Sequence, residues 1–225
     1  MAEVIRVPFG FVSAFLVRGE KVILVDAGVP SGMARLRRAM DAHGIKPSEV
    51  SLILLTHGHT DHAGGANAAR QLTGAKVAMH RACAENLRHG RLPVSPPRTT
   101  MAWVLQNLFG RLMKVEPVEP DIEIDDEFDL RPFGMDGKAV PTPGHTSGCL
   151  SVFLSDGQAI VGDLLAGRRK GRGAMLPMFL WDSGKLGRSL ERVVKEAPTI
   201  IHNAHGDACP LAACRALLES MRTTV

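Results

Sequence analysis

Three histidines and one aspartate fall within six residues of one short segment, residues 57–62. His57 and His59 are two residues apart, too close to share one helix face, so a turn or a strand end must present them. Asp61 and His62 follow immediately, and we expect their side chains to point in a different direction from those of His57 and His59. Imidazole pairs at tight spacing beside a carboxylate suit borderline metals such as zinc. We therefore interpret this segment as part of a metal site rather than as a polar surface loop.

The residues on either side of this segment predict the elements that must hold it. Residues 50–55 form a short, nearly continuous apolar run, which is typical of a strand buried on both faces. Residues 63–72 have helical propensity, with glycines at the entry where the backbone must turn sharply. The ligand-type residues thus lie at a strand end, on a loop and at a helix start, a common placement for an active site.

Three further ligand-type residues occur singly, each after a predicted strand. His145 lies in a Gly/Pro-rich turn at residues 141–148, Asp163 follows an apolar run, and His205 follows another. Each signal is weak alone. Three more strand-end ligands in the same chain favour a shared site.

Strand and helix patterns along the rest of the chain predict a layered domain. Residues 11–18 and 21–26 indicate a hairpin with a two-residue turn, and Ser31 is a candidate cap for a helix reaching about residue 43. Further strands are expected at residues 76–80, 122–124, 138–141, 149–154 and 158–161, and further helices at 187–196 and 211–221. This pattern predicts an α/β fold, an αββα sandwich of two mixed β-sheets flanked by helices. We expect one domain spanning residues 1–225.

Two segments fit this scheme less well. Residues 81–120 include a predicted helix for which core packing is the favoured interpretation, with a lid over a pocket or a dimer surface as the alternative. Residues 166–181 mix basic and apolar side chains and could wall a pocket. The apolar residues of the predicted helix are Met101, Val104, Leu105, Leu108 and Leu112 on one face, with Trp103 and Phe109 beside them.

Composition limits the classes of protein to consider. The 225 residues are 45% hydrophobic, enough for one substantial core, without a run of membrane-spanning length or a signal-peptide pattern. The four cysteines include no CxxC pair, so we expect reduced thiols in a cytoplasmic protein without membrane contact. The net charge of +4 comes from scattered basic residues except at residues 168–172, which disfavours a nucleic-acid partner. If that loop borders a pocket, an anionic small-molecule substrate is expected.

Taken together, these motifs resemble the metallo-β-lactamase superfamily, in which HxHxDH is followed by separate His, Asp and His motifs in that order. The match spans nearly the whole chain. The resemblance implies two metal ions with separate ligand sets and one bridging carboxylate. The first ion would be held by His57, His59 and His145, the second by Asp61, His62 and His205, and the bridge would be Asp163.

Three residues outside this set also receive an interpretation. Asp26, in the sequence VDAG, fits the early aspartate turn of the superfamily and is interpreted as a carboxylate that orients a ligand imidazole. His80 and His202 match no ligand motif and are expected to be structural.

The resemblance further implies a hydrolytic chemistry. The donor set suits two divalent ions, foremost zinc, with iron or manganese also compatible. A hydroxide bridging the ions is a nucleophile at neutral pH, because metal binding lowers the pKa of water from ~15.7 to about 7. Asp61 would be the catalytic residue, orienting the hydroxide and carrying its proton to the leaving group.

Residues outside the ligand set narrow the functions that this superfamily hosts. Flavodiiron reductases carry glutamate where this chain has His59, superfamily nucleases add large inserted domains, and true β-lactamases are usually exported. Glyoxalase II and the best-known acyl-homoserine lactonases use tyrosines, and this chain has none. A small hydrolase of an ester, thioester or lactone remains, with residues 81–120 and 166–181 as its substrate walls.

Two other functions stay open. A persulfide dioxygenase of the same superfamily would bind a single iron through residues matching His57, His145 and Asp163. A non-catalytic metal-binding protein would hold the ions without turnover. A homodimer is compatible with all of these functions.

Overall fold

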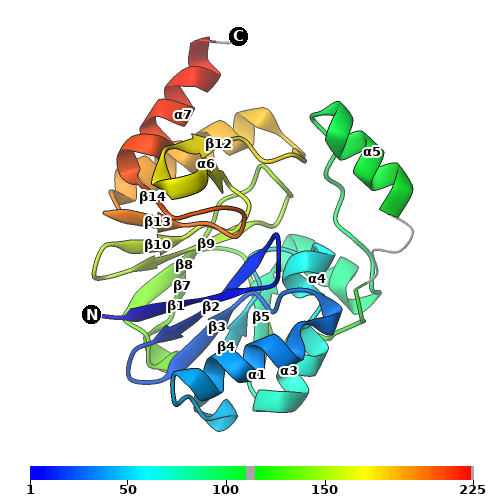
Figure 1. Ribbon diagram of the computed structural model, residues 1–225, viewed down its shortest axis with the longest axis vertical. Coiled ribbons are helices and arrows are strands. Elements are labelled where there is room, and N and C mark those ends of the chain that lie inside the picture. Colours follow the sequence, from blue (N-terminus) through cyan, green and yellow to red (C-terminus); the bar gives the residue numbers. More distant parts are fainter. Residues whose placement is uncertain (110–114, 224–225) are drawn as a thin grey trace.

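Two six-stranded sheets form the centre of the molecule in a computed structural model. The structure describes residues 1–109 and 115–223, and for residues 105 and 109 it describes the backbone alone. The first sheet has the strand order β1-β2-β3-β4-β5-β6, and the second has the order β14-β13-β10-β9-β8-β7 (Figure 1). A separate two-stranded hairpin consists of β11 and β12.

Both sheets are mixed, as the sequence predicts. In the first sheet, β1, β2 and β3 pair antiparallel, whereas β3, β4, β5 and β6 pair parallel. In the second sheet, β10 and β13 pair parallel and the other neighbours pair antiparallel. The first sheet contains β1 (Glu3–Pro8), β2 (Ser13–Arg18), β3 (Val22–Val25), β4 (Val50–Leu54), β5 (Lys76–His80) and β6 (Ile122–Ile124). The remaining strands are β7 (Phe128–Asp129), β8 (Gly137–Pro141), β9 (Leu150–Leu154), β10 (Gln158–Ile160), β11 (Ala166–Gly167), β12 (Ala174–Met175), β13 (Ile200–His202) and β14 (Cys209–Pro210).

Helices cover the outer faces of the two sheets. Helices α1 and α3 lie against the first sheet and α6 and α7 against the second, with α5 standing apart from both (Figure 1). The helices are α1 (Met33–Ala42), α2 (Thr60–Ala63), α3 (Ala66–Thr73), α4 (Arg81–Arg88), α5 (Thr100–Phe109), α6 (Ser183–Glu196) and α7 (Leu211–Thr223). Short 3₁₀ turns occupy Pro30–Gly32, Pro47–Glu49, Arg131–Phe133 and Arg169–Gly171. None of the described helices is long and apolar enough to cross a membrane.

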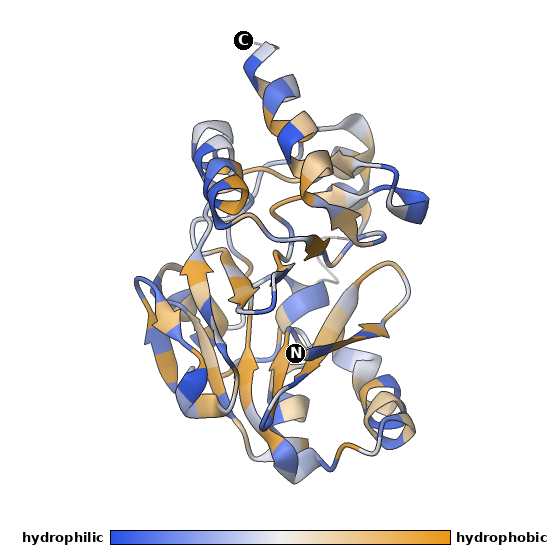
Figure 2. Cartoon of the chain, turned by 90° about the vertical axis from the view of Figure 1, so that its left-hand side faces the viewer, coloured by the Kyte–Doolittle hydropathy of each residue, from blue (hydrophilic) through white to orange (hydrophobic). Residues whose placement is uncertain are grey.

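Three apolar clusters fill the spaces between these layers. Phe15 and Val152, one from each sheet, belong to the cluster between the sheets. Leu36 of α1 belongs to the cluster on the outer face of the first sheet, and Leu190 and Leu218 belong to that of the second. The strands are accordingly the most hydrophobic part of the chain in Figure 2. This is the αββα sandwich that the sequence predicts.

Local details differ from the sequence prediction in three places. The prediction misses β1, although Ile5 and Val7 alternate inward on it. Because Arg18 pairs with Val22, the β2–β3 turn has three residues rather than two. Ser31 does not cap α1, since it lies within a preceding 3₁₀ turn and the N-cap position is Gly32, without a side-chain bond.

The favoured core-packing interpretation of α5 is wrong for Met101 and Leu108. Their exposed fractions are 63% and 66%, and Trp103 beside them is 57% exposed, whereas the small Ala102 is fully buried. Leu112 and the side chains of residues 105 and 109 lie outside the described part.

The strand directions bring every ligand-type residue to one edge of the sandwich. Asp26 and His57 follow the ends of the parallel strands β3 and β4. His145, Asp163 and His205 follow the ends of β8, β10 and β13, which all run in one direction through the second sheet.

Candidate metal centre

Three histidines form one compact set of nitrogen donors at this edge. His57 and His59 come from the loop after β4, and His145 comes from the loop between β8 and β9. Nε2 of His57 lies 3.1 Å from Nδ1 of His59, and Nε2 of His145 lies 3.2 Å from the former and 2.9 Å from the latter. We call these residues the three-histidine set.

A second group combines one carboxylate with two imidazoles. Asp61 and His62 lie on α2, and His205 lies in the loop between β13 and β14. Oδ2 of Asp61 lies 3.7 Å from Nε2 of His62 and 3.3 Å from Nε2 of His205. We call these residues the mixed set.

Asp163 lies between the two sets and presents one carboxylate oxygen to each. Its Oδ1 lies 3.2 Å from Nε2 of His62 and 3.3 Å from Nε2 of His205. Its Oδ2 lies 3.4 Å from Nε2 of His145 and 4.0 Å from Nε2 of His57. The structure therefore brings all seven of the ligand residues predicted from the sequence into one cluster.

Asp26 supports one histidine of each set from behind. Its carboxylate accepts hydrogen bonds from the Thr56 backbone N–H (2.7 Å), the Thr56 hydroxyl (2.8 Å) and Nδ1 of His62 (2.8 Å). Because the Thr56 hydroxyl hydrogen points to Asp26, its oxygen is left to accept from Nδ1 of His57, 3.1 Å away. Both imidazoles thus have Nε2 free to face the cluster, and the expectation that Asp26 orients a ligand imidazole agrees with these contacts.

Main-chain carbonyl groups orient the two histidines that are distant in sequence. Nδ1 of His145 donates to the Phe179 carbonyl oxygen at 2.8 Å, and Nδ1 of His205 donates to the Phe11 carbonyl oxygen at 3.0 Å. The hydroxyl of the buried Ser95 donates to the His145 carbonyl oxygen at 2.6 Å. Sequence reasoning misses Phe11, Phe179 and Ser95, because a carbonyl acceptor is common to all residues and a lone serine carries no distinguishing signal.

Burial keeps the three-histidine set neutral. Burial and then the neighbouring His62 lower the pKa of His57 well below its usual value. Burial, reinforced by His145, lowers the pKa of His59 to about 3, and burial also lowers the pKa of His145. Neutral imidazoles have a free nitrogen lone pair, which is the form that binds a metal.

The mixed set is charged. Burial disfavours the charged form of His205, but Asp163 and then Asp61 raise its pKa to about 10. Burial similarly opposes ionisation of Asp61, but His62 and His205 lower its pKa to about 2. Imidazole and carboxylate groups therefore stabilise one another in this half of the cluster, and binding of a cation would release the proton of His205, because a ligating imidazole is neutral.

The donor set and its geometry fit two metal ions. Nitrogens bound to one tetrahedral zinc at about 2.0–2.1 Å lie roughly 3.3 Å apart, close to the spacing within the three-histidine set. Nε2 of His62 and Oδ1 of Asp163 are buried and lack a hydrogen bond, although they lie 3.2 Å apart as an ion pair. Unsatisfied buried atoms cost about 1–3 kcal/mol each, and a cation between them would satisfy both.

The hairpin of β11 and β12 is fixed to the loop that carries His205. The Gly167 N–H donates to the His205 carbonyl oxygen at 2.8 Å, and the Lys170 N–H donates to Asp207 at 2.7 Å. Gly206 has a φ of +99°, and a Cβ there would lie 1.9 Å from the Gly167 carbonyl oxygen, so this contact requires glycine. Between the two strands lies the basic loop of residues 168–172.

Two histidines and the four cysteines lie outside the cluster. His80 caps α4 by accepting from the Ala82 N–H at 3.0 Å, and His202 contacts Gln158 at 3.0 Å. Both contacts are structural, as the sequence suggests for these two histidines. All four cysteines are free and buried.

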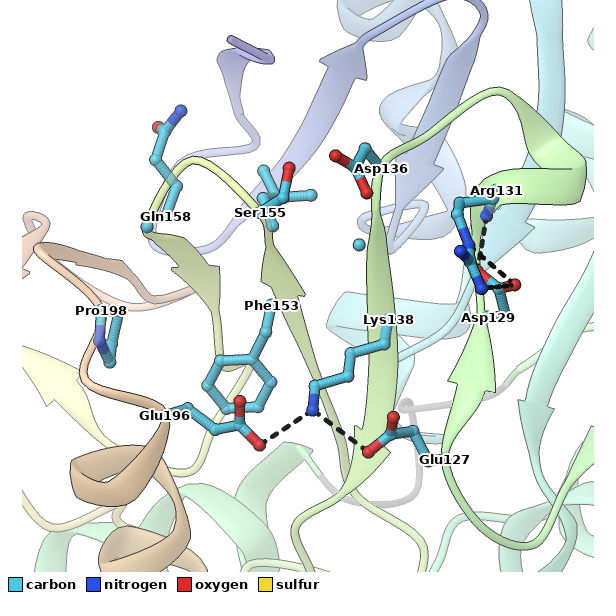
Figure 3. A pocket seen from close by; sticks show the side chains of 13 residues that line it. Glu127, Asp129, Arg131, Asp136, Lys138, Phe153, Ser155, Gln158, Glu196 and Pro198 are labelled. Carbon is cyan, nitrogen blue, oxygen red and sulfur yellow. Dashed lines mark hydrogen bonds and ion pairs between the residues drawn. The ribbon is translucent and has the colours of Figure 1, made fainter.

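A polar depression of about 350 Å³ lies at the opposite end of the second sheet (Figure 3). Lys138 lies at its centre between Glu127 (3.2 Å) and Glu196 (3.1 Å). Asp136 and Gln158, at its edge, lie at the strand ends remote from the metal cluster. Its central charges are paired with one another, and we assign it no part in the chemistry.

Comparisons with known proteins agree with the fold and identify the family. The family model of the metallo-beta-lactamase superfamily matches residues 7–205, and the chain belongs to this superfamily. A metal-dependent hydrolase class is consistent with its curated relatives. A probable metallo-hydrolase of Bacillus subtilis is 26% identical over 157 residues, which are 62% of this chain and 53% of the relative. A hydroxyacylglutathione hydrolase of Anaeromyxobacter dehalogenans is 29% identical over 212 residues, 91% of this chain and 64% of the relative.

The chain thus spans between half and two thirds of the length of these two relatives. Among solved structures, an archaeal metallo-beta-lactamase superfamily protein from Sulfolobus tokodaii is similar, with a TM-score of 0.72 and 22% identity. That similarity covers 99% of this chain and 87% of the other, and it shows the fold alone.

Proposed function

We propose that this protein is a metal-dependent hydrolase of an ester, thioester or lactone. The observation that carries the proposal is the position of Asp163, whose two oxygens face different ligand sets. Each oxygen of Asp163 would bind a different ion, so both oxygens act as ligands only when two ions are bound. The proposed ligands are His57, His59 and His145 for one ion, Asp61, His62 and His205 for the other, and Asp163 for both.

Two divalent ions, foremost zinc, would lower the pKa of bound water enough to give hydroxide near neutral pH and would polarise the substrate carbonyl. Within the chain, the Asp61 carboxylate would hold the proton of the attacking water and pass it to the leaving group. Asp26 and the carbonyl groups of Phe11 and Phe179 would keep the imidazoles in the tautomer that presents Nε2. No serine or cysteine nucleophile is needed.

The surroundings of the cluster support a small-molecule substrate with an anionic group. In the described part of the chain, the side chains of Arg168, Arg169, Lys170 and Arg172 are exposed and form no ion pair. Their loop is attached to the His205 loop through Gly167 and Lys170. Unpaired cations beside a cleft raise the local concentration of anions. We propose the described part of residues 81–120, together with residues 166–181, as the substrate walls of a single domain, residues 1–225.

Hydrolysis is tested with protein loaded with zinc, iron or manganese and with the same protein after chelation. We expect turnover of at least one member of a panel of thioesters, lactones and carboxylic esters, about two ions per chain, and loss of turnover on chelation. No turnover across the panel at full metal loading would instead support a non-catalytic metal-binding protein.

A single-iron persulfide dioxygenase is the second candidate, because His57, His145 and Asp163 also lie together. The convergence of His62 and His205 on Asp163, with Asp61 beside both histidines, favours two ions over one. One iron per chain with oxygen uptake on a persulfide substrate would replace our proposal with this one.

A further inference from the structure

The exposed large apolar side chains are confined to three segments of the described chain. Apart from Met1, they are Phe11, Val94, Met101, Trp103, Leu108, Met175 and Met178, which we call the apolar rim. The segments are the loop between β1 and β2, residues 94–108, and residues 175–178. Large apolar side chains gathered on a surface in this way mark an interaction site.

The first segment contacts the mixed set directly. The ring of Phe11 is 69% exposed, yet it stacks on His205 with ring centroids 5.9 Å apart and an angle of 9° between the planes. The Phe11 carbonyl also accepts from the same imidazole. One face of Phe11 therefore rests on a proposed metal ligand, and the rest of the ring is open to a bound molecule.

The other two segments contact the three-histidine set. Ser95, next to Val94, donates from its hydroxyl to the His145 carbonyl oxygen at 2.6 Å. Phe179, next to Met178, lies with its ring centroid 6.5 Å from that of His59. Phe11 thus contacts the mixed set, and chain neighbours of Val94 and Met178 contact the three-histidine set.

Hydrogen bonds join these two segments into one wall. The Arg98 N–H donates to the Met178 carbonyl oxygen at 2.9 Å, and the Leu180 N–H donates to the Pro96 carbonyl oxygen at 2.9 Å. The Arg98 guanidinium donates to the Pro177 carbonyl oxygen at 3.0 Å. Helix α5 begins at Thr100, directly after this junction, so its position is tied to the segment that contacts His59.

Helix α5 presents apolar side chains in several directions. Met101 and Leu108 are seven residues apart and share a face, and Trp103 lies on another. A helix with exposed apolar side chains on more than one face normally contacts another apolar group. In Figure 1 this helix stands apart from the layers of the sandwich.

We propose that the apolar rim binds the acyl chain of an ester or thioester whose carbonyl group lies at the metal cluster. A surface that served only to bind a second copy or a membrane through α5 would not account for Phe11, which comes from the other half of the site. The feature shared by all three segments is contact with the ligand residues. This inference rests on the proposed hydrolase function and specifies its substrate as having an extended apolar acyl group.

The test varies the acyl chain while holding the leaving group constant. Zinc-loaded protein is assayed with the p-nitrophenyl esters of acetate, butyrate and octanoate. Full burial of one methylene group strengthens binding about fourfold, so even partial burial predicts at least a tenfold rise in kcat/KM from acetate to octanoate. A flat or falling profile would overturn the acyl-chain assignment.

Variants in two separate parts of the rim locate the binding surface. We expect Trp103→Ala and Phe11→Ala each to lower the octanoate-to-acetate ratio of kcat/KM at least fivefold. The matched control is Gln106→Ala, because Gln106 is an exposed polar residue of the same helix. Zinc content and circular dichroism are measured for every variant. An unchanged ratio in Trp103→Ala and Phe11→Ala, with normal zinc content, would contradict the proposal.

The remaining outcomes separate failure of this inference from failure of the proposed function. Absence of hydrolysis of every ester, thioester and lactone of the panel at full zinc loading would remove the hydrolase function itself. Hydrolysis with a flat chain-length profile would keep that function and overturn the acyl-chain assignment. If, in addition, sedimentation finds a dimer or binding to phosphatidylcholine vesicles that Trp103→Ala abolishes, α5 contacts a second copy or a membrane instead.

Discussion

The two halves of the cluster use different physical means to hold their donors. The three-histidine set is enclosed and neutral, with His57 and His145 almost fully buried and backed by Thr56, Ser95 and a carbonyl group. The side chains of Asp61 and His205 in the mixed set remain 24% and 29% exposed and carry charge. The enclosed half is therefore suited to retaining an ion, and the open half to admitting water and substrate.

Asp163 is the residue that joins the two halves, so its removal should have the largest effect. We expect Asp163→Ala to lower kcat/KM by at least about 10³-fold and to reduce the metal content below two ions per chain, because both sets lose an oxygen ligand. Metal analysis, steady-state kinetics and circular dichroism check this. The exposed Asp136, at the opposite end of the sheet, provides the control Asp136→Ala. Wild-type rate and metal content in Asp163→Ala would show that the ligand assignment is wrong.

Single-histidine variants should distinguish the halves. We expect His205→Ala to lose the ion of the mixed set and to keep the other, because the three-histidine set does not use His205. His145→Ala should lose the ion of the three-histidine set and should also abolish activity while leaving the fold largely intact. Titration of the apo variants with zinc measures the number of sites. Loss of both ions in both variants would mean that the halves bind cooperatively rather than separately.

Replacing Asp26 should have a smaller effect, because Asp26 contacts the ligands and not the ions. In Asp26→Asn, an amide N–H₂ would face donors that now bond to a carboxylate oxygen. We expect about 10–100-fold weaker zinc binding and about 1–3 kcal/mol lower stability. Asparagine tolerates the φ of +60° at this position, so backbone strain is not introduced. Zinc competition and urea unfolding test this, and unchanged zinc affinity would contradict the orienting role.

The reactivities of two cysteine thiols, one near each half of the cluster, should show the smallest difference. Cys149 and Cys209 each lie four residues after a proposed ligand, His145 and His205. Burial raises the pKa of Cys149 to about 12 and raises that of Cys209 less strongly. At pH 8, a pKa of about 12 leaves roughly 10⁻⁴ of a thiol as reactive thiolate. We therefore expect Cys209 to react faster than Cys149 with a maleimide reagent in native protein, measured by peptide mass spectrometry. Faster labelling of Cys149 would show that the three-histidine half opens more readily.

Much of the fold follows from local patterns in the sequence. The apolar runs at residues 50–55 and in β2 and β3 are strong signals, because strands buried on both faces carry a nearly continuous apolar sequence. The short β7, β11, β12 and β14 escape prediction because two residues carry no periodicity. The prediction that α5 is buried is wrong, because an apolar helix has the same sequence pattern whether it packs against another layer of the fold or faces solvent.

The sequence by itself predicted the seven proposed donor residues and their placement near strand ends, because donor chemistry and strand patterning are properties of short segments. It also determined that Asp26 follows a buried strand beside them. Only the tertiary structure decided that the two oxygens of Asp163 face different sets, that His59 presents Nδ1, and that two distant carbonyl groups orient His145 and His205. These facts depend on distances between elements far apart in the chain, which the packing of two sheets sets and no local pattern records.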